Sequence, residues 1–104
     1  MTMEVLKFSD MDCGICHKMS NYDSRVATEL GLGFVQVIIQ DRPVYRKYRA
    51  VFCAQYPKVA GIHEGAGWPT YFVMSDDKLI GEIKGGMDKG EFRQRLKKIL
   101  DDTR

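Results

Sequence analysis

Cysteine, proline and long hydrophobic runs are all scarce in this chain. Its 104 residues include three cysteines, three prolines and a single tryptophan. So few cysteines do not make the disulfide framework that stabilises small secreted domains. No apolar run approaches the roughly 20 residues that a membrane-spanning helix needs, and residues 1–4 show no basic and apolar secretory leader. We therefore expect a cytoplasmic protein that does not act at a membrane.

An excess of charge of either sign is also lacking. The 16 basic and 14 acidic residues leave a formal net charge of +2, and the two signs are mixed along the chain. This balance argues against nucleic acid as a partner. The densest basic stretch, residues 42–49, is interpreted as a solvated helix face. Without a linker, a repeat or a low-complexity segment, the sequence predicts a single domain spanning residues 1–104 and a monomer.

Hydrophobic patterning predicts alternating strands and helices. The β-prone segments are residues 5–8, 34–39, 70–74 and 78–83. Apolar residues three and four apart predict one helix from residue 14 to Gly31 or Gly33, a second over residues 43–56, and a third after a capping box at Asp88 and Glu91. The continuous run 34–39 suits the buried middle of a sheet. The order βαβα-ββα predicts an α/β fold with a central mixed four-stranded sheet flanked by helices, its first two strands parallel.

The chemistry-bearing motif is Cys13-Gly14-Ile15-Cys16, between the first strand and the first helix. The positive end of that helix stabilises a thiolate on Cys13, which lowers its pKa from the free value of about 8.5. Cys16, one turn further in, is expected to be more buried. In thiol–disulfide exchange Cys13 would attack a substrate disulfide, and Cys16 would resolve the mixed disulfide.

This motif resembles the Cys-Gly-Pro-Cys motif of the thioredoxin family, which likewise follows a strand and precedes a helix. Trp68-Pro69-Thr70 looks like the family's cis-proline segment, which faces the cysteine pair, and Gly85-Gly86 looks like the glycine beside its active site. The resemblance covers nearly the whole chain. It implies a thioredoxin-like fold, no cofactor, protein disulfide substrates, and an unidentified reductase such as a thioredoxin reductase. It also implies substrate contacts at Trp68, Pro69, Thr70 and Gly85.

The chain departs from the family pattern around the cysteines. Asp12 replaces the tryptophan before the motif, Ile15 replaces its proline, and Lys7 falls where the family has a buried acid that assists proton transfer. Either the charge of Lys7 adjusts the thiol pKa or water takes over the proton transfer. The candidate pKa-tuning residues are Lys7 and His17, which favour the thiolate, and Asp10 and Asp12, which oppose it. The segment between Arg42 and Gly67 is longer than in thioredoxins and is a candidate partner surface.

Other roles for the same residues remain open. Cys13-Gly14-Ile15-Cys16-His17 also spells the c-type haem attachment motif, with Met74 or Met87 as an axial ligand. Zinc would use Cys13, Cys16 and His17 with Cys53 or His63. Both are disfavoured, because the motif lies in a strand-rich region and no second tight cysteine pair is present. Cys53 is otherwise interpreted as a small buried hydrophobe, and Trp68 as an exposed ring over the cysteines.

Two further functions compete with protein disulfide exchange. A glutaredoxin-like use of glutathione is the nearest enzymatic alternative, although the cysteine loop lacks that family's usual aromatic residue. A non-catalytic binding subunit would dock its partner through Trp68 and residues 42–67.

Overall fold

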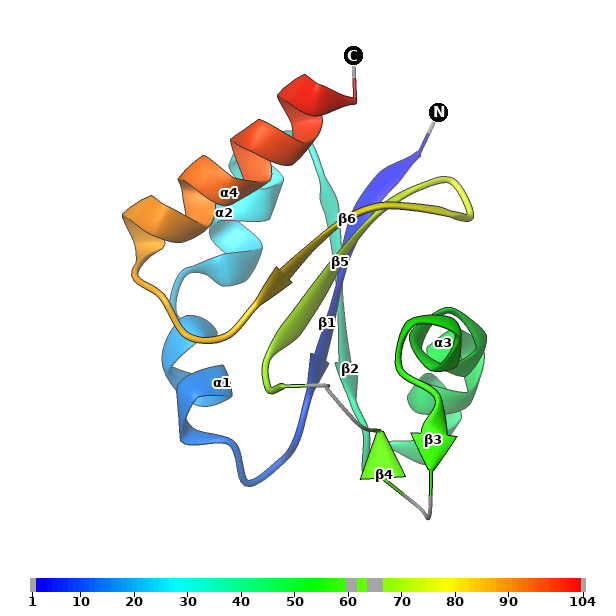
Figure 1. Ribbon diagram of the computed structural model, residues 1–104. Coiled ribbons are helices and arrows are strands. Elements are labelled where there is room, and N and C mark those ends of the chain that lie inside the picture. Colours follow the sequence, from blue (N-terminus) through cyan, green and yellow to red (C-terminus); the bar gives the residue numbers. More distant parts are fainter. Residues whose placement is uncertain (1, 60–61, 64–66, 104) are drawn as a thin grey trace.

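Four strands form a mixed sheet in the computed structural model, which describes residues 2–59, 62–63 and 67–103 (Figure 1). They are β1 (Met3–Ser9), β2 (Gly33–Ile38), β5 (Thr70–Ser75) and β6 (Lys78–Lys84), in the order β2-β1-β5-β6. Strand β1 pairs in parallel with β2 and antiparallel with β5, and β5 pairs antiparallel with β6. The predicted mixed four-stranded sheet with a parallel first pair is therefore confirmed.

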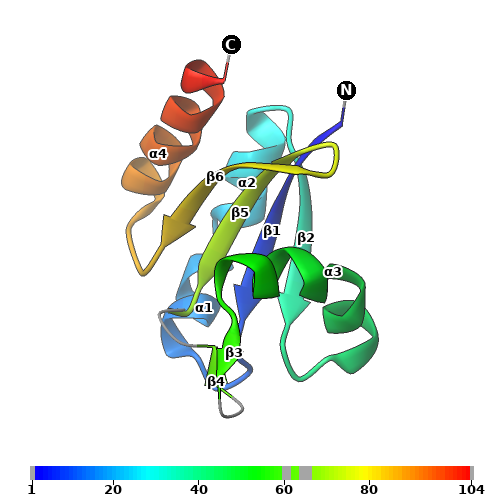
Figure 2. The same ribbon diagram turned by 45° about the vertical axis from the view of Figure 1, so that its right-hand side comes forward.

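Helices cover both faces of this sheet. They are α1 (Gly14–Met19), α2 (Asp23–Glu29), α3 (Arg42–Gln55) and α4 (Lys89–Asp102). Helices α2 and α4 lie on one face and α3 on the other (Figure 1), and the turned view shows the same layers (Figure 2). Among the described residues, no helix is long and apolar enough to cross a bilayer.

The single helix predicted from residue 14 to Gly31 or Gly33 is wrong, because the chain forms two helices there. The Ser20 hydroxyl donates to the Cys16 carbonyl at 2.9 Å, and the backbone N–H groups of Asn21 and Tyr22 bond to carbonyls three residues back. Serine side chains that bond to nearby backbone compete with continued helix. The tightened turn ends α1, and α2 then starts at Asp23.

The prediction that residues 34–39 form a buried middle strand is also wrong. Strand β2 is an edge of the sheet, and only Val37 within it is buried. The buried strands are β1 and β5, because each has a neighbour on both sides and helices over both faces. The predicted loop before Trp68 contains a small antiparallel sheet of β3 (Lys58–Val59) and β4 (Ile62–His63), while Gly61 and Gly65 lie outside the described residues.

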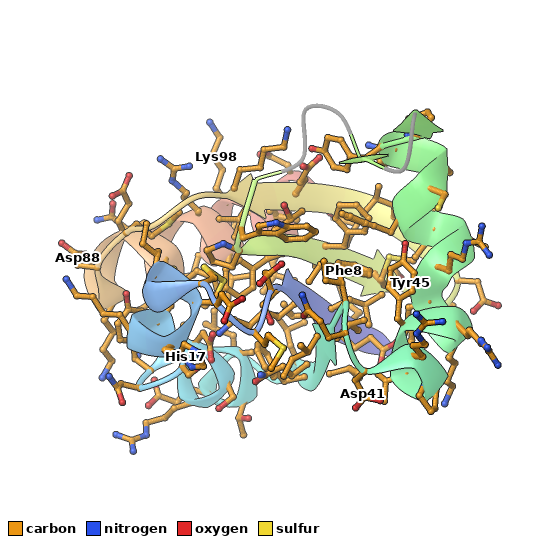
Figure 3. All side chains as sticks on the ribbon, turned by 90° about the horizontal axis from the view of Figure 1, so that it is seen from below. Phe8, His17, Asp41, Tyr45, Asp88 and Lys98 are labelled. Carbon is orange, nitrogen blue, oxygen red and sulfur yellow. A yellow bond between two sulfur atoms is a disulfide. The ribbon has the colours of Figure 1, made fainter. Side chains whose placement is uncertain are left out.

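The core consists of two clusters separated by the sheet. Side chains alternate along β1, so Val5 packs under α2 and α4, whereas Leu6 and Phe8 pack under α3. The α3 cluster is aromatic, with the Phe8 and Phe52 ring centroids 4.4 Å apart. Seen from the end where β1 stops, Phe8 and Tyr45 lie toward α3, and His17 lies on the other side (Figure 3). By the same alternation, Lys7 faces α1 and α2.

Candidate functional site

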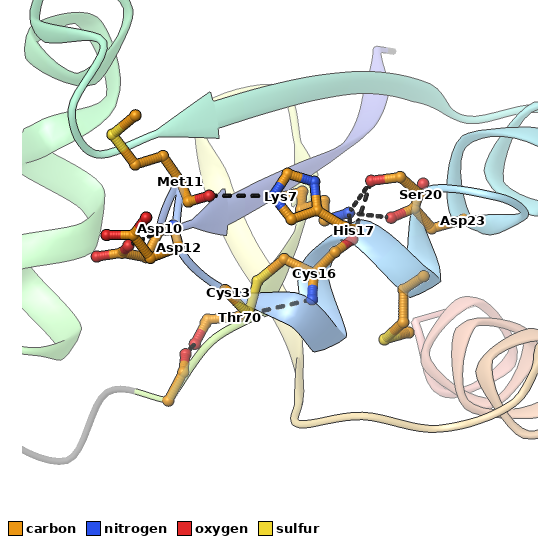
Figure 4. Close-up of a disulfide and its surroundings, with 12 residues drawn as sticks. Lys7, Asp10, Met11, Asp12, Cys13, Cys16, His17, Ser20, Asp23 and Thr70 are labelled. Carbon is orange, nitrogen blue, oxygen red and sulfur yellow. Dashed lines mark hydrogen bonds and ion pairs between the residues drawn. A yellow bond between two sulfur atoms is a disulfide. The ribbon is translucent and has the colours of Figure 1, made fainter.

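Cys13 and Cys16 form a disulfide at the start of α1 (Figure 4). Cys13 is the N-cap residue in an extended conformation, and Cys16 is in the first turn, with the two Cα atoms 5.2 Å apart. The Cys16 N–H donates to the Cys13 sulfur at 3.1 Å. Cys13 is half-buried, whereas Cys16 is 3% exposed. The first cysteine can therefore meet a substrate while the second is sheltered beneath it.

Asp10 holds the loop that leads from β1 to Cys13. One carboxylate oxygen accepts from the Asp12 N–H at 2.9 Å, and the other accepts from the Gln40 side chain at 3.0 Å. These bonds hold the pKa of Asp10 below its ordinary value. The Cys13 N–H donates to the Asp10 carbonyl at 3.0 Å. The loop is thus braced against the end of β2 before it delivers Cys13.

His17 and Asp12 lie at the surface beside this loop. The His17 ring is exposed, and its Nε2 is hydrogen-bonded with the Met11 carbonyl oxygen at 3.0 Å (Figure 4). Asp12 is exposed. Water screens exposed charges, so their influence on the sulfurs is weaker than that of a buried charge.

The cis-proline segment, just before β5, and Gly85, just after β6, meet at the end of the sheet where β1 stops. The Trp68–Pro69 peptide bond is cis, as the resemblance predicts, and the Gly85 N–H donates to the Pro69 carbonyl at 3.1 Å. Gly85 has a φ of +85°, a conformation that glycine adopts readily. Buried Thr70 pairs with Phe8 near the end of β1, and its hydroxyl donates to the Gly67 carbonyl. The structure thus places Pro69, Thr70 and Gly85 beside the strand end that carries the cysteine loop.

Trp68 is half-buried, so the predicted exposed ring over the cysteines is wrong. Its ring stacks on Phe52 of α3, with centroids 5.7 Å apart and planes 14° apart. The aromatic α3 cluster provides a large apolar surface that the sequence spacing did not indicate. The indole is consequently anchored to the α3 side, and the backbone beside the cis bond stays near the cysteine loop.

Lys7 lies completely buried beneath the cysteine helix, and its partner was missed from the sequence. Its ammonium donates to the Asp23 carboxylate at 2.6 Å, the Cys16 carbonyl at 2.9 Å and the Ser20 hydroxyl at 2.9 Å (Figure 4). Asp23 is 2% exposed. A lysine at a buried strand position was the available signal, because a buried cation requires an anion within reach.

The exposed apolar side chains flank the cysteine pair. Among the described residues the large hydrophobic side chains that are exposed are Met11 at 56% and Ile15 at 50%. A hollow of about 400 Å³ lies beside Ile15, and its lining also includes Lys18, Met19, Tyr22, Gly86, Met87 and Asp88. A Cβ on Gly86 would lie 2.6 Å from the Ile15 side chain, so the missing side chain of Gly86 lets these two segments meet.

The metal and haem alternatives gain no support from the described residues. No group of three histidine, cysteine or acidic side chains that could hold a metal occurs among them, and the His63 side chain lies outside the description. Met74 is buried in the α3 cluster.

Cys53 is half-buried on α3 and not fully buried as expected. Burial, followed by the neighbouring Cys53 side chain, raises the pKa of Tyr45.

Solved structures similar to this one include several thioredoxins. The chain is 14% identical to thioredoxin 1 of Thermosipho africanus, with a TM-score of 0.64 and coverage of 96% of this chain and 97% of that one. For Trypanosoma brucei brucei thioredoxin the identity is 21%, the TM-score 0.64 and the coverage 97% and 77%. For the reduced Schistosoma mansoni thioredoxin pre-protein the values are 18%, 0.64, 94% and 79%. No protein-family model and no curated protein matches the sequence. These likenesses show that the chain has the thioredoxin fold.

Proposed function

We propose that this thioredoxin-fold protein is a thiol–disulfide oxidoreductase that acts on protein disulfides. The observation that carries the proposal is the pairing of a half-buried Cys13, at the N-terminus of α1, with a nearly inaccessible Cys16 bonded to it. A helix N-terminus favours the thiolate of the outer cysteine. The inner cysteine is within reach of it and shielded from competing reactions.

In the reducing direction of this reversible exchange, two electrons pass from the dithiol to a substrate disulfide. The Cys13 thiolate attacks one substrate sulfur, forms a mixed disulfide and releases the other sulfur as a thiolate. Cys16 then loses its proton to the released thiolate or to water and attacks the Cys13 sulfur. This second step forms the Cys13–Cys16 disulfide and releases the remaining substrate sulfur. A reductase, such as a thioredoxin reductase, would return the two electrons to the protein.

A protein substrate is favoured by the surface around Cys13. The exposed Met11 and Ile15 side chains lie two residues before and after the nucleophile, and the hollow beside Ile15 has room for an apolar side chain. An extended substrate segment would meet the backbone of Trp68, Pro69, Thr70 and Gly85 on the other side. We place this activity in the cytoplasm, with the protein acting as a monomer.

Insulin reduction with dithiothreitol as electron source tests the proposal. We expect Cys13→Ser to abolish turnover, because the attacking sulfur is lost. Cys16→Ser should trap a mixed disulfide with the substrate, visible as a covalent adduct by mass spectrometry. Cys53→Ser is the matched control and should keep wild-type turnover, because Cys53 lies on α3.

The same experiment separates the competing functions. Unchanged turnover in Cys13→Ser would contradict the proposal. Reduction of glutathione mixed disulfides without reduction of insulin would favour the glutaredoxin-like function. Partner binding that survives in Cys13→Ser, with no turnover by the wild-type protein, would favour a binding subunit.

A further inference from the structure

Lys7 projects from the central strand β1 into a hydrogen-bonded cluster beneath α1. The ammonium has three hydrogens, and each has an acceptor: the Asp23 carboxylate, the Cys16 carbonyl and the Ser20 hydroxyl. The lysine side chain is 0% exposed. Burying an ammonium in apolar surroundings is strongly unfavourable unless it is paired and hydrogen-bonded. The buried Lys7 ammonium therefore requires these three acceptors to be stable in the protein interior.

Asp23 completes the cluster from the first turn of α2. Its Oδ2 accepts from Lys7 at 2.6 Å and from the buried Tyr71 hydroxyl at 2.8 Å, and its Oδ1 accepts from the Ser24 N–H at 2.6 Å. Burial, and then the charge of Asp23, raises the pKa of Tyr71, so the phenol stays a hydrogen-bond donor. Across the described residues, no buried side-chain nitrogen or oxygen lacks a hydrogen-bond partner.

The orientation of the ion pair places its positive end on the second cysteine. The ammonium touches Cys16, whereas the remaining contacts of the carboxylate are with Tyr71 and Ser24. The Cys16 carbonyl accepts from Lys7, from the Ser20 N–H at 3.1 Å and from the Ser20 hydroxyl at 2.9 Å. The Cys16 N–H in turn donates to the Cys13 sulfur. Cys16 is therefore held on both sides of its backbone.

We propose that Lys7, held in place by Asp23, is a positioning residue for Cys16 and shifts the redox equilibrium of the cysteine couple toward the dithiol. The inference rests on the proposed function, in which the reduced protein carries a thiolate and Cys16 itself becomes one during the second step. That negative charge develops on a cysteine that is 3% exposed, where water stabilises it poorly. A buried ammonium on the same residue stabilises it, because Coulomb attraction is stronger in a low-dielectric interior.

The other charged groups around the cysteines reach the surface or are paired with Lys7. Asp10 and Asp12 are on the loop, and His17 and Lys18 are on α1; all four reach solvent and are screened by it. Asp23 on α2 is paired with the ammonium, and the Tyr71 hydroxyl on β5 donates to Asp23. Lys7 is thus the buried cation that contacts the cysteine pair among the residues described.

The test measures the dithiol–disulfide equilibrium in glutathione redox buffers, together with the pH profile of Cys13 alkylation. Lys7→Met combined with Asp23→Asn removes both charges and leaves an acceptor for Tyr71. We expect its equilibrium to move about tenfold toward the disulfide, which is about 30 mV for a two-electron couple. The midpoint of alkylation should move to higher pH, because the thiolate has lost the nearby cation.

Asp23→Asn alone should shift the redox equilibrium and the alkylation midpoint in the opposite direction to the double variant. It leaves the ammonium without its counter-charge, so the equilibrium should move toward the dithiol and the alkylation midpoint to lower pH. Lys97→Met, on the exposed surface of α4, is the matched control and should stay within about twofold of wild type. Circular dichroism and a single unfolding transition identify the variants that are folded. The result from any one folded variant is enough to support or overturn the proposal.

Unchanged equilibrium and alkylation in a folded variant would overturn the proposal. If Lys7 had only a structural role, both variants would be less stable. The redox equilibrium and the alkylation midpoint would then not shift in opposite directions between the double variant and Asp23→Asn. The glutathione equilibrium needs no protein substrate, so it stands apart from the insulin assay. A wild-type protein that equilibrates with glutathione but does not reduce insulin would contradict the proposed function and leave the role of Lys7 standing.

Discussion

Ile15 occupies the position between the two cysteines at which the thioredoxin motif has proline. Its side chain is 50% exposed and meets the chain at Gly86, where a Cβ would come within 2.6 Å of it. An isoleucine at this place presents exposed apolar surface two residues from Cys13, the proposed nucleophile. Under the proposed function, the exposed Ile15 side chain would contact a protein substrate and influence which substrates bind.

Ile15→Ser is expected to weaken the docking of a protein substrate without altering the cysteines. Losing the exposed part of the side chain costs about 1 kcal/mol of binding, so KM for insulin should rise about fivefold with kcat little changed. Turnover of a small substrate, hydroxyethyl disulfide, should stay within about twofold of wild type. Ala54→Ser, on the exposed face of α3, serves as the control. An equal loss on both substrates would place the effect in the cysteines and refute a docking role.

Polar side chains set the start of α4 and the end of α1. Asp88 caps α4, since its carboxylate accepts from the Glu91 N–H at 2.8 Å. Ser20 ends α1 by bonding back to the Cys16 carbonyl. Because α1 stops there, α2 begins anew and carries Asp23 in its first turn beneath the site. The break between α1 and α2 therefore places Asp23 at the start of a new helix, where its carboxylate pairs with Lys7.

Asp88→Ala should lower the free energy of unfolding by about 1 kcal/mol, because a backbone N–H at the start of α4 loses its acceptor. Urea unfolding at neutral pH measures the loss. Asp88→Asn is the matched variant, since asparagine also caps helices well, and it should retain most of the stability. Equal losses in the two variants would assign the effect to the charge of Asp88 and contradict the capping role.

The whole molecule is organised around one sheet that two core clusters share. Phe52 and Trp68 belong to the cluster under α3, whereas Phe92 belongs to the cluster under α2 and α4. Both clusters take side chains from β1 and β5, so neither can lose its packing without affecting the strands of the other. We infer that residues on both faces unfold together as one cooperative unit.

Phe92→Leu tests this inference, because its effect should reach the opposite face of the sheet. The substitution should lower the free energy of unfolding by about 1–3 kcal/mol. Fluorescence of Trp68, the single tryptophan, reports on the α3 face, and far-UV circular dichroism reports on the whole chain. The two urea midpoints should coincide and move together. Separate midpoints would show that the faces unfold independently, against the predicted single domain.

The features that the sequence predicted correctly lie within short stretches of chain. The four strands of the main sheet and the cysteine pair at a helix start follow from periodicity and spacing, which involve neighbouring residues. The resemblance to thioredoxins implied the cis bond before Pro69. Three other features appear only in the folded chain: β2 is an edge strand, Trp68 stacks on Phe52, and Lys7 pairs with Asp23, 16 residues away. Each of these depends on which side chains the packed elements bring together. The burial of a charge and the identity of its partner are properties of that packing, and no local pattern contains them.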